Sequence, residues 1–252
     1  MSKKSTSWDK VAKWYDDLLS LEGTYQQEVI LPNLMRLVDP KRGQIILDLA
    51  CGQGFFAKHF ADKGAEVVGL DLSPELITRA KKSVPQAKFF VANAENLSVL
   101  KNDSIDSVVC VLALQNIKNI SAVFKECNRV LKNGGCFSIV LNHPAFRVPK
   151  QSSWGWDDVK KIQYRRIDEY LSEKTVSIEM HPGKKKSTKE TTLSFHRPLQ
   201  FWFKQLQSSG FFVSRLEEWV SHKINQPGPK AAAENKARHE FPLFLYLEAL
   251  KI

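Results

Sequence analysis

The sequence has few cysteines and no long apolar run. Its four cysteines among 252 residues show no C-x-x-C spacing, and most lie in or beside apolar runs, where cysteine usually behaves as a small buried hydrophobe. This pattern disfavours a metal site and favours a reducing, cytoplasmic compartment. No stretch approaches the roughly 18 apolar residues that a membrane span requires, and the polar N-terminus lacks the apolar core of a signal peptide. We therefore expect a soluble protein.

The charge is strongly positive but unevenly placed. The net charge is +10, and almost all of the basic excess lies in residues 101–252. Such an excess can indicate a polyanionic partner such as nucleic acid. A lysine run such as residues 184–186 is more often a solvated turn, so a nucleic-acid partner is possible but not favoured.

Short β-branched runs alternate with helical patterns from about residue 45 to residue 141. The predicted strands are 45–49, 66–71, 88–91, 107–112 and 136–141. Alternation of this kind is typical of βαβ units and a parallel sheet. Two further strands near 211–219 and 243–250 complete the sheet, so we expect one α/β domain over residues 1–252.

Residues 145–196 interrupt this alternation. We interpret them as an insertion with a short amphipathic helix, whose apolar positions are Val159, Ile162, Ile167 and Leu171. Two strand-like runs follow around a turn at residues 183–186. The insertion also carries aromatic and basic residues, which suit either a flat or acidic small molecule or unpaired bases.

A glycine loop from Asp48 to Gly54 follows the first predicted strand. Gly52 and Gly54 allow a tight turn and a close approach to a ligand, and the amide groups of the following helix start point into the same place. The spacing Gly52-x-Gly54-x-x-Ala57 also fits the dinucleotide fingerprint, and Asp71 ends the next strand, where an acid binds ribose hydroxyls. The loop therefore predicts a nucleoside-containing ligand.

Asp48 helps to distinguish between two classes of such ligands. A pyrophosphate beside this carboxylate would be repelled in a poorly hydrated pocket, whereas an ammonium group would be a natural partner. The alternative is that Asp48 only caps the following turn or helix.

Residues 46–54 resemble the first motif of class I S-adenosylmethionine-dependent methyltransferases, with Ala50 where the commonest form has glycine. The family's later motifs follow in order at residues 71–72, 93–97, 106–116 and 129–135, and the resemblance covers roughly residues 8–142 and 196–252. It implies a Rossmann-like seven-stranded mixed sheet of order 3-2-1-4-5-7-6, with strand 7 antiparallel, flanked by helices and with an insertion after strand 5.

The resemblance also implies S-adenosyl-L-methionine as the cofactor. The residues that it assigns to cofactor binding are Asp48, Ala50, Cys51, Gly52, Gly54, Asp71, Leu72, Asn93, Ala94, Ala113, Leu114, Gln115 and Tyr15. Asn93 stands where the family usually has aspartate; its amide suits the adenine edge, although it could equally be a simple turn residue.

The resemblance implies three regions on the substrate side: the N-terminal lid helices at residues 1–40, the end of strand 5 with His143, and the insertion at 145–196. Residues 8–15 resemble the lid helix of small-molecule methyltransferases, including those of quinone biosynthesis. Tyr15 there and His143 after strand 5 are the catalytic candidates: the resemblance implies that Tyr15 lies close to the cofactor, and a histidine has a pKa near neutrality, which suits proton removal. Each has a structural alternative, Tyr15 as part of a buried helix face and His143 as a structural histidine.

The leading hypothesis is a methyltransferase that acts on a small molecule by in-line displacement. An RNA or tRNA methyltransferase is the alternative that the basic second part favours, although Ala113-Leu114-Gln115-Asn116 lacks the Asn/Asp-Pro-Pro-aromatic pattern of enzymes that methylate base amino groups. A catalytically silent cofactor-binding regulator is a further alternative. A nicotinamide oxidoreductase has only the glycine spacing in its favour, and Asp48 weighs against it.

Overall fold

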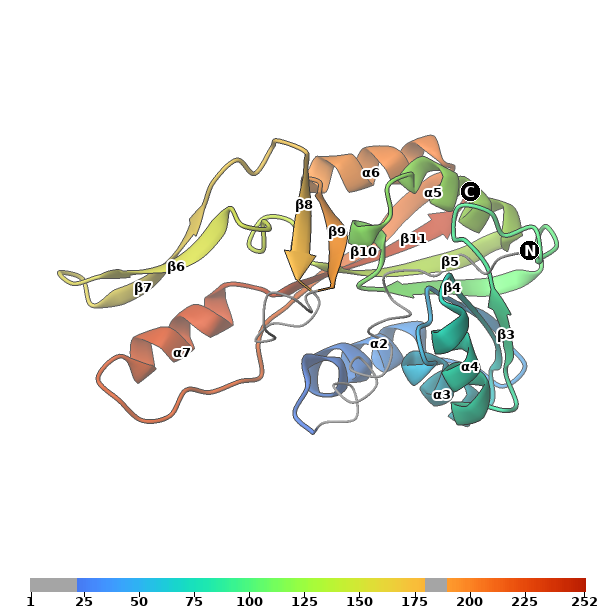
Figure 1. Ribbon diagram of the computed structural model, residues 1–252, viewed down its shortest axis with the longest axis horizontal. Coiled ribbons are helices and arrows are strands. Elements are labelled where there is room, and N and C mark those ends of the chain that lie inside the picture. Colours follow the sequence, from blue (N-terminus) through green and yellow to red (C-terminus); the bar gives the residue numbers. More distant parts are fainter. Residues whose placement is uncertain (1–21, 180–189) are drawn as a thin grey trace.

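A seven-stranded sheet forms the centre of the computed structural model, which describes residues 22–179 and 190–252. The strand order is β10-β11-β5-β4-β1-β2-β3 (Figure 1). Neighbours among β1 to β5 run parallel, and β11 runs antiparallel to both β5 and β10. The strands are β1 (Ile45–Leu49), β2 (Glu66–Asp71), β3 (Lys88–Val91), β4 (Ile105–Val111), β5 (Leu131–Asn142), β10 (Phe211–Trp219) and β11 (Phe244–Lys251). The predicted order, with the last strand antiparallel, is confirmed.

Helices cover both faces of the sheet (Figure 1). One layer contains α2 (Leu31–Val38), preceded by a π-helical turn at Gln26–Ile30, α3 (Phe55–Asp62) and α4 (Pro74–Ser83); the other contains α5 (Ile120–Val130) and α6 (Leu199–Ser208). Successive strand residues face opposite layers: Ile46 packs in the core beneath α2 to α4, and Leu47 in the core beneath α5 and α6. Burial on both faces explains why the central strands are nearly continuous apolar runs.

The helix predicted in the insertion is wrong, because this segment forms a β-hairpin. Strands β6 (Ser152–Asp157) and β7 (Ile162–Ile167) pair antiparallel. Val159 lies in the turn with 93% of its surface exposed and Leu171 is 67% exposed, so the apolar spacing does not mark a buried helix face.

Two further elements complete this part of the molecule. Strands β8 (Lys174–Glu179) and β9 (Thr191–His196) pair antiparallel, as the two strand-like runs indicated; the predicted turn at 183–186 lies outside the described residues. Helix α7 (Ala231–Glu240), which the sequence did not predict, lies against β7. Together β6, β7 and α7 project from the body of the molecule (Figure 1).

Within residues 22–179 and 190–252, no helix is long and apolar enough to cross a membrane. In the same ranges, no three His, Cys, Asp or Glu side chains gather where they could hold a metal ion.

Candidate cofactor site

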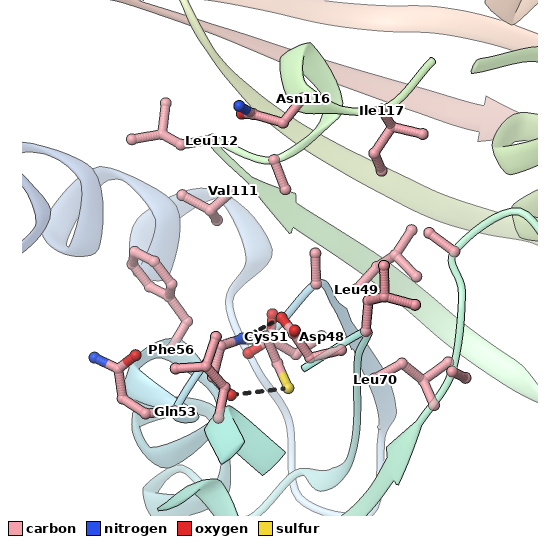
Figure 2. A pocket seen from close by; sticks show the side chains of 18 of the residues that line it. Asp48, Leu49, Cys51, Gln53, Phe56, Leu70, Val111, Leu112, Asn116 and Ile117 are labelled. Atoms are coloured by element: carbon pink, nitrogen blue, oxygen red, sulfur yellow. Dashed lines mark hydrogen bonds between the residues drawn. The ribbon is translucent and has the colours of Figure 1, made fainter. Parts of the chain in front are cut away.

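A cavity of about 1040 Å³ opens at the carboxyl ends of β1, β2 and β4 (Figure 2). Ligands of open α/β sheets bind at this edge, where loops leave the strands. Figure 2 shows Leu112 and Asn116 across the cavity from Asp48 and Cys51. Nine of the residues assigned to cofactor binding line it: Asp48, Ala50, Cys51, Gly52, Asp71, Leu72, Asn93, Ala94 and Ala113.

Three of the assigned residues that the structure describes do not line this cavity. Gly54 begins α3, and a Cβ added there would meet Ala80 Cβ of α4 at 3.3 Å, so its place in the motif allows two helices to pack closely. Leu114 is fully buried in the core beneath α5 and α6, and Gln115 faces a different cavity. Tyr15 lies outside the described residues.

The glycine loop alternates in backbone conformation. Ala50, Gly52 and Gly54 have positive φ angles of 58°, 56° and 84°, a region that costs a residue with a Cβ roughly 1–2 kcal/mol. The Cys51 amide donates to the Leu70 carbonyl oxygen at 3.0 Å and so fixes the loop to β2. Ala50 therefore retains the conformation for which the family's usual glycine is suited.

Asp71 is held in place by the loops around it. One carboxylate oxygen accepts from the Gly52 amide at 2.9 Å, and the other accepts from the Ser73 amide at 2.9 Å. These contacts fix the orientation of Asp71 in the wall of the cavity. Ser73 in turn caps α4 by accepting from the Leu76 amide.

Asp48 combines the two roles that the sequence left open. Its Oδ2 accepts from the Ala57 amide in the first turn of α3 at 3.1 Å, and the side chain lines the cavity with only 2% of its surface exposed. Burial raises the pKa of Asp48 to about 7; the Ala57 hydrogen bond opposes the rise and the charge of Asp71 adds to it. A cationic ligand group would stabilise the ionised form.

Asn93 forms a turn and also lines the cavity. Its side-chain oxygen accepts from the Glu95 amide at 3.0 Å, the Asx-turn arrangement expected of a turn residue. Contact between Asn93 and adenine stays a prediction. Leu72, which also lines the cavity, is 51% exposed and offers an apolar surface that a flat ring would cover.

Other lining residues were not predicted. Gln53 lies between the two glycines, is 6% exposed and has no hydrogen-bond partner for Oε1 among the described residues. Its position in the glycine motif was the signal that could have identified it. The other unpredicted side chains are brought to the cavity only by the fold. The unpredicted lining residues are Leu49, Gln53, Phe55, Phe56, Leu70, Leu76, Ala92, Val111, Leu112, Asn116 and Ile117.

His143 lies away from this cavity and is 4% exposed. Its Nε2 is 2.7 Å from Glu218 Oε1, and its Nδ1 accepts from the amides of Ala145 and Phe146. Burial lowers the pKa of His143, although Glu218 opposes this effect. Both ring nitrogens therefore bond the protein, which favours the structural alternative; a proton-accepting role stays a prediction.

The cavity suits a ligand that donates hydrogen bonds and carries positive charge. Its polar wall contains two carboxylates, Asp48 and Asp71, and Gln53, whose side-chain oxygen has no partner within residues 22–179 and 190–252. The ammonium group and ribose hydroxyls of S-adenosylmethionine match these acceptors, whereas the pyrophosphate of a dinucleotide would face two carboxylates in a poorly hydrated site.

Comparison with known proteins agrees with this geometry. Residues 47–139 match a family described as "Methyltransferase domain". A methyltransferase of Synechocystis sp., described as uncharacterized, is 40% identical over 103 residues, which are 40% of this chain and 48% of that protein. The demethylmenaquinone methyltransferase of Chlorobaculum parvum is 36% identical over 138 residues, 53% of this chain and 57% of that protein. The chain thus spans about half the length of these curated relatives.

A solved structure extends the similarity beyond the matched domain. An S-adenosylmethionine-dependent methyltransferase from Mesorhizobium loti superposes with a TM-score of 0.72 and 26% identity, over 90% of this chain and all of that one. Residues 47–139 thus match a methyltransferase domain, and the fold as a whole is similar to that of an S-adenosylmethionine-dependent methyltransferase.

Proposed function

We propose that the protein transfers a methyl group from S-adenosylmethionine to a small-molecule acceptor. The observation that carries this proposal is the cavity at the ends of β1, β2 and β4, with Asp48 and Asp71 in its wall. A small-molecule acceptor is supported by the Chlorobaculum parvum relative, whose name gives demethylmenaquinone as its substrate.

The protein's part in such a reaction is to bind, align and exclude water. S-adenosylmethionine, when bound, supplies a methyl group on a sulfonium sulfur. Asp71 would hold the ribose hydroxyls and Asp48 the ammonium group, while the apolar side chains of Leu112 and Ile117 restrict water in the same cavity. Alignment of two reactants can contribute roughly 7–11 kcal/mol to lowering a barrier, so the proposal does not require a catalytic base for an already nucleophilic acceptor.

Calorimetric titration of the purified protein with S-adenosylhomocysteine, S-adenosylmethionine and NAD tests the cofactor. We expect the first two to bind and NAD not to bind. Asp71→Ala should weaken binding by about 100-fold or more, because it removes a charged acceptor from the ligand and from the Gly52 and Ser73 amides. Asp62→Ala, at an exposed position that ends α3, is the control. Binding of NAD alone would refute the proposal.

An acceptor screen then tests the substrate class. Small quinols, phenols and carboxylic acids are compared with tRNA by the rate of S-adenosylhomocysteine formation. Turnover of a small molecule supports the proposal. Turnover of tRNA alone, with binding that falls steeply as salt rises, would replace it with the nucleic-acid alternative.

A further inference from the structure

A second, smaller cavity lies at the carboxyl end of β5, next to β4 in the sheet. Its wall includes Gln115, Arg147, His196, Arg197 and Trp202. These residues come from the loop after β4, the segment after β5, the end of β9 and α6. The cavity thus lies at the same sheet edge as the cofactor cavity, one strand further along.

One short segment separates the two cavities. Within residues 113–117, Ala113, Asn116 and Ile117 line the cofactor cavity, and Gln115 lines the second. Arg197 fixes this segment by donating to the carbonyl oxygens of Leu114, Ile117 and Lys118 at 3.4, 2.9 and 2.8 Å. A small molecule in the second cavity would therefore lie next to the cofactor site.

The arginines of this cavity bond neutral groups, which distinguishes them from five of the other eight arginines in the sequence. Arg147 donates to Asn142 Oδ1 at 2.6 Å and lies over the Phe244 ring, and Arg197 bonds carbonyl oxygens and contacts aromatic rings. Among the described residues, neither forms an ion pair with a carboxylate. Ion pairs with Glu or Asp are formed instead by Arg36, Arg79, Arg129, Arg166 and Arg215.

Arg197 is the more deeply placed of the two. It is 5% exposed, and burial lowers the pKa of Arg197 to about 10, an effect that the charge of Glu173 partly opposes. The side chain stays protonated at neutral pH, and a buried cation without a counter-ion is costly. The rings of Phe195, Phe201 and Trp202 offset part of this cost. Arg147, which is exposed, completes a pair of cations at the same cavity.

Gln115 gives a second indication of a ligand. Its Nε2 donates to the Leu112 carbonyl oxygen at 2.6 Å, which fixes the amide orientation, and its Oε1 is buried without a partner in the part of the chain that the structure describes. Buried polar atoms in native proteins are nearly always satisfied. A hydroxyl or N–H group on a bound molecule would satisfy this oxygen.

We propose that the second cavity binds a carboxylate group of the methyl acceptor, with Arg147 and Arg197 as its counter-ions. The proposal rests on the proposed methyl transfer and specifies its substrate class: a small carboxylic acid that also carries a hydroxyl or N–H group. Guanidinium groups match a planar carboxylate by bidentate hydrogen bonds. The methyl-accepting atom would lie on the side of the molecule that faces residues 113–117.

Indole ¹⁵N NMR tests this proposal, because Trp202 lines the cavity. The probe is 3-hydroxybenzoate, and 3-hydroxybenzamide is its neutral counterpart of the same shape. We expect the acid to shift the Trp202 indole signal saturably, with an affinity about tenfold or more above that of the amide. The Trp202 signal is assigned with Trp202→Phe, and Trp154 and Trp156 on the hairpin serve as internal references.

Arg147→Gln should weaken the binding of 3-hydroxybenzoate about tenfold and leave the affinity for 3-hydroxybenzamide unchanged. Arg147→Lys should restore part of the lost affinity. Arg166→Gln, on the hairpin and paired with Asp168, is the matched control. Equal affinity for acid and amide, no shift with either probe, or an unchanged affinity in Arg147→Gln would overturn the carboxylate site. Titration of the same samples with S-adenosylhomocysteine separates this failure from that of the proposed function. If the cofactor product binds and the carboxylate does not, only the carboxylate site is refuted. If the carboxylate binds and the cofactor product does not, the proposed methyl transfer is refuted, and with it the assignment of this ligand as the acceptor.

Discussion

The cofactor half of the molecule, residues 45–142, and the arm formed by β6, β7 and α7 are built in opposite ways. The strands β1 and β4 are buried on both faces, and the cavity between their ends is lined by side chains fixed through backbone hydrogen bonds. In contrast, none of the residues of β6 or β7 is fully buried. Similarity to known families follows the same division, since the matched domain ends at residue 139. The family match therefore covers the region that holds the cofactor cavity and does not include the arm.

The largest expected effect in this comparison is the dependence of stability on pH that Asp48 causes. Burial raises its pKa to about 7, above the ordinary value near 4, so the folded protein holds this proton more tightly than the unfolded chain does. The carboxyl therefore lowers the stability as pH rises from about 4 to 7, by up to about 4 kcal/mol in total. Asp48→Asn should remove this loss and unfold at higher urea than the wild type at pH 8, while binding S-adenosylhomocysteine more weakly. Parallel stability profiles between pH 5 and 8 for the two proteins would show that Asp48 is not strained in the ligand-free site.

A pair of glycines compares the packing of the two regions directly. A Cβ at Gly69 in β2 would lie 2.3 Å from two ring atoms of Phe89, which is 4% exposed, so Gly69→Ala should cost about 3 kcal/mol. At Gly155 in β6 the Cβ would approach Tyr164, also at 2.3 Å, but that ring is 46% exposed and can turn away. Gly155→Ala should therefore lower the free energy of unfolding by less than about 1 kcal/mol. Urea unfolding of both variants checks the difference, and equal losses would contradict it.

Trp154 tests whether the arm is energetically separate from the cofactor site. Its ring packs edge-on against Phe241 with centroids 5.4 Å apart, and the Arg165 guanidinium lies 5.0 Å from it. Trp154→Ala should lower stability by about 1–2 kcal/mol through the loss of these contacts. Calorimetry should find the affinity for S-adenosylhomocysteine unchanged. A clear loss of affinity would mean that the arm helps to shape the cofactor cavity.

Ala50→Gly should have the smallest effect. The φ angle of 58° at Ala50 is unfavourable for a side chain with a Cβ, and glycine removes that cost while adding entropy to the unfolded chain. We expect a gain of at most about 1 kcal/mol, measured by thermal unfolding, and no loss of cofactor binding. A destabilised variant would show that the alanine methyl group contributes packing that outweighs the strain.

The cofactor half could be predicted because its signals are local. The sequence from Asp48 to Gly54 contains both the residues that turn the backbone and those that line the cavity, and Asp71 ends the next strand. The parallel order of the strands also follows from their alternation with helices. Leu112 and Ile117, in contrast, reach the cavity only because β4 lies beside β1, and no spacing in the sequence reports that.

The arm was harder to predict because its stability does not come from a buried apolar face. In β7 the side chains alternate between exposed and partly buried, and the two positions that completed the apparent helical stripe, Val159 and Leu171, are exposed. Helix α7 has one fully buried residue, Ala237, so it carries no apolar periodicity. Its run of alanine, glutamate, lysine and arginine was the available signal, since these residues favour helices intrinsically.

The position of β11 has a consequence for the order of events during synthesis. This strand ends at Lys251 yet lies inside the sheet, between β5 and β10. On a ribosome, β5 is therefore complete more than a hundred residues before its antiparallel neighbour emerges. Until then its apolar edge has unpaired backbone groups, a state that favours aggregation. The complete sheet can therefore form only after the residues of β11 have been synthesised.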